Sequence, residues 1–90
     1  MAKAVVDPDE LRHFAMSLKK FLTGLNGSMA QMQGQMISLG QTWRDQEHAK
    51  FQSEFEDTLR ALARFSDSAE QHIPFLLRKA ERIEEYLKQR

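Results

Sequence analysis

The second half of the sequence repeats apolar or small residues at alternating spacings of four and three, and the alternation holds without a slip. A mean spacing of about 3.5 residues is typical of a helix that packs along a left-handed coiled-coil seam. The residues of this seam are Phe55, Leu59, Leu62, Ser66, Ala69, Ile73, Leu76, Ala80, Ile83 and Leu87. Beside the seam, a second row recurs at multiples of seven residues and consists of Phe51, Thr58, Phe65, His72 and Tyr86. This half of the chain is therefore predicted to form a long helix with two adjacent packing rows.

The first half carries a similar pattern behind a strong helix start. Asp7 is placed to act as the N-cap and Pro8 to occupy the first helical position, where its missing N–H costs nothing. Apolar residues then follow at spacings of three and four or their sums, at Leu11, Phe14, Leu18, Phe21, Leu25, Met32 and Leu39. A flanking row with a period of seven holds Ala15, Leu22, Met29 and Met36. These rows predict a first helix over about 8–39.

Two features could interrupt these helices. Gly24 and Gly27 weaken the first helix, since each interior glycine costs up to about 1 kcal/mol relative to alanine. We expect the first helix to continue, because its apolar phase runs through both glycines; a break into a three-helix arrangement is the alternative. Pro74 removes an amide donor from the second helix. A kink is expected near this proline, and a separate C-terminal helix is the alternative.

The stretch between the two patterns is predicted to be the turn of a helical hairpin, at about 40–42. Gly40 is expected to end the first helix in a left-handed cap, because glycine adopts positive φ without steric cost. Thr42 is expected to cap the second helix, with Asp45 completing a carboxylate variant of the capping box. Trp43 is the sequence's only tryptophan, and we expect its ring to pack into the cleft between the helix ends.

The two predicted helices differ in length. At about 1.5 Å per residue, a second helix over about 43–88 runs roughly 65 Å and the first helix roughly 48 Å. The end of the second helix, residues 81–90, is therefore expected to project beyond the first. Ile83, Tyr86 and Leu87 keep an apolar stripe there, which makes this end a candidate for recognition by a partner.

Ninety residues form one small domain, 1–90. A lone hairpin of this size buries too little apolar surface to offset the conformational entropy of folding. The sequence has no cysteine and no metal-ligand spacing, so association remains as the means of stabilising the fold. Two packing rows on each helix suit an all-α, antiparallel helical hairpin that dimerises into a four-helix bundle. The candidates for contacts between chains are Leu22, Phe51 and Phe65.

Charge and motif content argue against several classes of function. Thirteen basic residues balance thirteen acidic ones, so no net field favours nucleic acid. No apolar run approaches the roughly 20 residues that span a bilayer, which argues against membrane insertion, and the N-terminus lacks the apolar core of a signal peptide. The three histidines are far apart, and no hydrolase elbow or phosphate loop is present. We therefore expect no catalysis, no cofactor and no metal site.

The turn and the start of the second helix resemble a known family. The residues that carry the resemblance are Trp43, Ala49, Phe51 and Phe55. A tryptophan in the turn of a hairpin of about this length resembles the Trp-X-Gly family of early secreted antigens, the small helical-hairpin substrates of type VII secretion. The resemblance covers nearly the whole chain. Asp45 stands where the family has its glycine, and Arg90 stands where the family has an acid, four residues after a tyrosine that is Tyr86 here.

The resemblance implies a function as well as a fold. Family members form four-helix-bundle homodimers or heterodimers, are exported without a cleaved signal, and are substrates or partners of a membrane-bound secretion ATPase. We therefore expect a dimeric hairpin protein that acts by protein–protein binding, to a second copy or a paralogous hairpin, and to a secretion ATPase. It would be secreted without a cleavable signal peptide, with Ile83, Tyr86 and Leu87 as recognition residues. The alternative is an intracellular helical adaptor, or a chaperone-like partner of a larger hairpin-bearing protein, which would be cytoplasmic.

Overall fold

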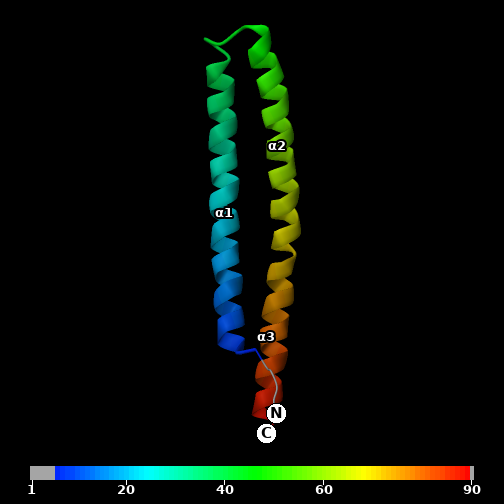
Figure 1. Ribbon diagram of the computed structural model, residues 1–90. Helices are drawn as coiled ribbons and strands as arrows, with labels where there is room; N and C mark the ends of the chain where they lie inside the picture. Colours follow the sequence, from blue (N-terminus) through cyan, green and yellow to red (C-terminus); the bar gives the residue numbers. More distant parts are fainter. Residues whose placement is uncertain (1–5, 90) are drawn as a thin grey trace.

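A computed structural model describes residues 6–89 as an antiparallel hairpin of helices (Figure 1). The first arm is α1 (Pro8–Leu39), and the second arm consists of α2 (Gln46–Glu70) followed end to end by α3 (His72–Lys88). The molecule is a rod with extents of 69 × 18 × 17 Å. α3 runs past the start of α1, so the second arm overhangs the first at this end (Figure 1).

The start of α1 follows from its capping residues. The Asp7 side chain accepts a hydrogen bond from the backbone N–H of Asp9 at 2.9 Å, and Pro8 occupies the first turn. α1 then continues through Gly24 and Gly27 without interruption. Its packing against the second arm outweighs the local preference of these glycines, because tertiary contacts routinely override intrinsic helix propensity.

The outward face of α1 holds three glycines that no neighbour requires. A Cβ atom added at Gly24, Gly27 or Gly34 would meet nothing within 4 Å. Changing all three to alanine is expected to raise the free energy of unfolding by roughly 1.5–3 kcal/mol, because alanine has the higher helix propensity. Denaturant unfolding measures this change. Gly40→Ala is the control and is expected to destabilise; a loss of stability in the triple variant would contradict the prediction.

Gly40 ends α1, but the expected left-handed conformation is wrong. Its φ and ψ are −64° and −14°, which is right-handed helical backbone, and its N–H donates to the carbonyls of Met36 and Ile37. The lack of room for a side chain explains why position 40 is a glycine. A Cβ at this position would lie 3.1 Å from the Cε1 atom of His48 and 3.3 Å from the carbonyl oxygen of Ile37. Gly40 therefore lets the start of α2 approach the end of α1.

The start of α2 also corrects the sequence prediction. Asp45, rather than Thr42, is the N-cap, and its side chain accepts a hydrogen bond from the N–H of His48 at 3.1 Å. The Thr42 hydroxyl donates back to the Leu39 carbonyl at 3.4 Å, so this side chain closes the turn. α2 consequently begins at Gln46, three residues later than residue 43.

The second arm breaks at Gln71 and continues as a separate helix. The N–H of Gln71 donates to the carbonyl of Ser68 at 3.2 Å, a tighter turn than that of an α-helix. Three residues later, Pro74 has no N–H with which to reach the carbonyl of Glu70. Gln71 keeps right-handed helical backbone, with φ −68° and ψ −19°, and the interruption lies before the proline because the lost hydrogen bond belongs to the preceding turn.

The core is one seam between the two arms. The side chains buried along it are Ala15, Leu22, Met36, Ser66, Ala69 and Ala80. The predicted seam of the second arm faces inward as expected, with only its last member, Leu87, classed as exposed. On α1, however, the flanking row is the buried one, and Phe14 and Phe21 of the main row are exposed. Leu22 is only 1% exposed, so it packs within its own hairpin and is not a contact between chains.

Candidate protein-protein interface

An aromatic cluster holds the turn of the hairpin. The Trp43 ring meets His48 edge-on, with centroids 5.1 Å apart, and lies 5.9 Å from the Phe51 ring. Phe51 in turn stacks on Phe55 at 5.7 Å. Trp43 and His48 are half-buried, and the Nε2 atom of His48 has no hydrogen-bond partner among the described residues. Capping by Asp45 and the space left at Gly40 bring these rings together.

A shallow apolar groove continues from this cluster along one side of the hairpin. It has a volume of about 150 Å³ and is lined by Met32, Gln35, Met36, Leu39, Phe51 and Phe55. The groove identifies which side of each arm shares this face. On α1 it is the side of Gln35, and on α2 it is the side of Phe51.

Four exposed phenylalanines lie on the same side of the hairpin as this apolar groove. Phe14 and Phe21 lie at multiples of seven residues from Gln35, and Phe65 lies two sevens from Phe51. Residues seven apart keep the same side of a helix within a coiled-coil-like hairpin. The exposed fractions are 57% for Phe14, 56% for Phe21, 43% for Phe51 and 51% for Phe65. These four residues are the aromatic face.

The groove on the opposite side of the hairpin is the more polar of the two. It has a volume of about 490 Å³ and is lined by Asn26, Met29, Ala30, Gln33, Glu56, Leu59, Arg60 and Ala63. Gln52 donates to Glu56 at 3.3 Å, and Arg60 pairs with Asp57 one turn away. Charged and amide side chains of this kind are well solvated when they are exposed. One side of the hairpin thus carries the four exposed phenylalanines, and the other carries charged and amide side chains together with the exposed Met16 and Ile37.

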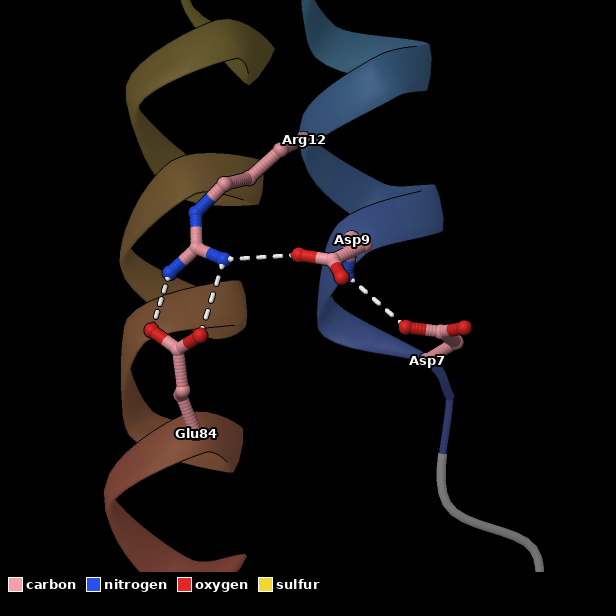
Figure 2. Close-up of polar contacts among 4 residues, drawn as sticks. All are labelled: Asp7, Asp9, Arg12 and Glu84. Atoms are coloured by element: carbon pink, nitrogen blue, oxygen red, sulfur yellow. Dashed lines mark hydrogen bonds and ion pairs between the residues drawn. The ribbon is translucent and has the colours of Figure 1, made fainter.

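The far end of the rod contains a polar contact between the arms. Arg12 of α1 forms a bidentate ion pair with Glu84 of α3, with N–O distances of 2.6 and 3.3 Å (Figure 2). Arg12 also bonds Asp9 at 3.3 Å, and Asp9 is linked through its N–H to the cap Asp7 (Figure 2). The hydrogen bonds and charge of Arg12 lower the pKa of the Glu84 carboxyl, while Glu84 raises the pKa of Arg12.

This pair gives stability a defined dependence on pH. The pKa of Glu84 is lower in the folded state than its ordinary value of 4.5. The contribution of the ion pair to the free energy of unfolding is therefore fully present above pH 4.5, and it is lost as the pH falls through the lowered pKa. We expect the difference in unfolding midpoint between the wild type and Glu84→Gln to stay constant from neutral pH to about pH 5 and to narrow in acid. Urea unfolding of both proteins, from neutral pH into acid, measures this difference. A difference that narrows near neutrality, or that persists unchanged in strong acid, would contradict the prediction.

The turn, interface and recognition residues predicted from the sequence are spread along the rod. Gly40, Trp43 and Asp45 meet at the turn, Phe51 and Phe65 lie along α2, and the remaining candidates lie at the end of α3. These are Ile83, Tyr86 and Leu87. Ile83 is half-buried in the hairpin, whereas Tyr86 and Leu87 are 60% and 40% exposed. Arg90 lies outside the described residues.

Sequence reasoning missed two contacts at the ends of the arms. Nothing in the spacing of Arg12 and Glu84, which are 72 positions apart, indicates that they pair. The contact of His48 with Gly40 could not be predicted from the sequence either, because it depends on how the two arms pack at the turn. Among residues 6–89, no group of three or more potential ligands is placed to hold a metal ion. No helix in this range combines the length and apolarity needed to cross a membrane.

The geometry defines a class of protein: a small helical hairpin with a tryptophan at its turn and one exposed aromatic side. The family model described as "Proteins of 100 residues with WXG", WXG100, matches residues 4–86. The chain belongs to the WXG100 family, whose members are small helical proteins exported by type VII secretion without signal peptides. No curated protein and no solved structure matches the sequence. Asp45 stands at the glycine of the family's name and caps α2.

Proposed function

We propose that the chain is a dimeric binding protein of type VII secretion, which pairs through its aromatic face with a second copy of itself. The observation that carries this proposal is the set of four half-exposed phenylalanines on one side of the hairpin. Full burial of a phenylalanine side chain stabilises by about 1.5–3 kcal/mol, and about half of that remains available at each of the four residues, so together they favour association. Two hairpins placed face to face would complete a four-helix bundle.

A second copy suits this face for electrostatic reasons as well. The chain carries equal numbers of basic and acidic residues, thirteen of each, so two copies meet without net repulsion. The side chains that line the polar groove would stay in water on the outside of such a bundle. A paralogous hairpin could present a similar face, which makes it the competing partner.

Co-purification of two differently tagged copies separates these partners. The chain is expressed with one tag alone, with both tags together, and in its native cells. Recovery of both tags in one complex supports the second copy. Recovery of a single tagged copy bound to another small hairpin would replace self-association with pairing to a paralogue. A larger hairpin-bearing protein in the complex would favour the adaptor or chaperone-like function.

The exposed end of α3 is the proposed site for recognition by the secretion ATPase. Tyr86 and Leu87 lie in the last turns of α3, the helix that overhangs the start of α1 (Figure 1), and are 60% and 40% exposed. Replacing both with serine is expected to leave the fold and the dimer intact and to abolish export. The control replaces the neighbouring Glu85 and Lys88 with serine. Unchanged export in the Tyr86 and Leu87 variant would remove the recognition role from this end.

A further inference from the structure

The second arm is built from two helical segments that meet at one weak point. The hydrogen-bond ladder tightens at Gln71, and Pro74 supplies no donor for the carbonyl of Glu70. Gln71 also gives α3 no side-chain cap. α2 and α3 are therefore joined by backbone that can change angle at a lower cost than the interior of a continuous helix.

α3 is joined to α1 by an ion pair as well as by apolar packing. Ala15 of α1 and Ala80 of α3 are both fully buried, so small side chains let α3 lie close against α1. The bidentate Arg12–Glu84 pair joins the same two helices (Figure 2). No ion pair links α1 to α2 among the described residues, since the pair of Arg60 lies within α2 itself.

We infer that α3 opens from α1 as a single unit about Gln71, and that the Arg12–Glu84 pair acts as the latch of the closed state. The pair is well suited to this role. Its two hydrogen bonds have the fork geometry of the strongest ion pairs, while its side chains remain 36% and 40% exposed, so breaking it brings water to both charges directly. Opening turns the amphipathic α3 into a free helix while α1 and α2 keep their own contacts. This inference does not depend on dimerisation or export.

Amide hydrogen exchange read residue by residue in the full chain tests the opening unit. A detached helix of 17 residues is marginal in water, so its amides lose protection together. We expect one common level of protection for the amides from Leu76 to Glu85, with a step to a higher level within α2. Protection that declines smoothly from the middle of α2 to the end of α3 would show fraying and overturn the inference.

The latch is tested with Arg12→Gln and a matched control, Arg60→Gln, which removes an ion pair internal to α2. Arg12→Gln is expected to lower the protection of α3 amides about three- to tenfold, while α2 amides in residues 50–65 keep theirs. Glu84→Gln should have the same effect, and the double variant should add little to either. An equal loss of protection in α2 and α3, or an equal loss in the Arg60 control, would overturn the role of the pair.

Discussion

Replacing Phe21 and Phe65 with glutamate is expected to weaken self-association by a factor on the order of a hundred or more. Each phenylalanine lies more than half exposed on the aromatic face of the single hairpin. Its remaining exposed half, when buried in a dimer, contributes roughly half of the 1.5–3 kcal/mol of a full burial, and about 1.4 kcal/mol corresponds to a tenfold change in affinity. A carboxylate buried at the same position adds a desolvation cost. Sedimentation equilibrium of the variant measures the change.

A matched control comes from the other side of α1. Met16 and Ile37 are also exposed apolar residues, but they lie at multiples of seven from Ala30, which lines the polar groove. Replacing both with glutamate adds the same charge to the chain and is expected to leave association unchanged. Equal weakening by the two pairs of substitutions would mean that net charge, rather than the aromatic face, controls association.

Trp43→Ala is expected to lower the free energy of unfolding by about 3 kcal/mol. This lies at the low end of the range for removing a packed aromatic ring, because Trp43 is half-buried rather than fully buried. The substitution removes the ring contacts with His48 and Phe51 that join the turn to α2. Urea unfolding of the variant gives the loss directly. In the wild type, tryptophan emission should be blue-shifted when folded and move to longer wavelength on unfolding.

Gln46→Ala is the comparison for this variant, since Gln46 is exposed at the first position of α2. Its effect should lie within about 0.5 kcal/mol, as for most surface substitutions. If Trp43→Ala proves as mild as this control and native emission matches that of a fully solvated indole, Trp43 is not part of the packing at the turn. The ring would then be available as a contact for a partner.

The hairpin could be predicted from sequence because its determinants are periodic. The inward seam of the second arm, from Phe55 to Ile83, follows a single heptad phase that fixes which side of the helix is buried. The choice of row on α1 could not be made in the same way. Two adjacent rows are both apolar, and periodicity does not say which one faces the chain's own second arm. Close approach buries the row with Ala15, keeps Leu11, Leu18 and Leu25 of the other row half-buried, and leaves the bulkier Phe14 and Phe21 outside.

The turn shows a second limit of sequence reasoning. Thr42 and Asp45 are both good capping residues, and helix-start signals alone do not separate positions three apart. The reason for Gly40 is a contact with His48, which exists only once α2 has folded back. Similarly, the pairing of Arg12 with Glu84 depends on how far α3 extends along α1. Each of these features is set by the meeting of the arms rather than by local sequence.

The mass of the protein in solution tests the central claim most directly. If the aromatic face is covered by a second copy, light scattering after gel filtration at micromolar concentration gives twice the chain mass of 10.5 kDa. A compact, stably folded particle of the single chain mass at the same concentration would contradict the account.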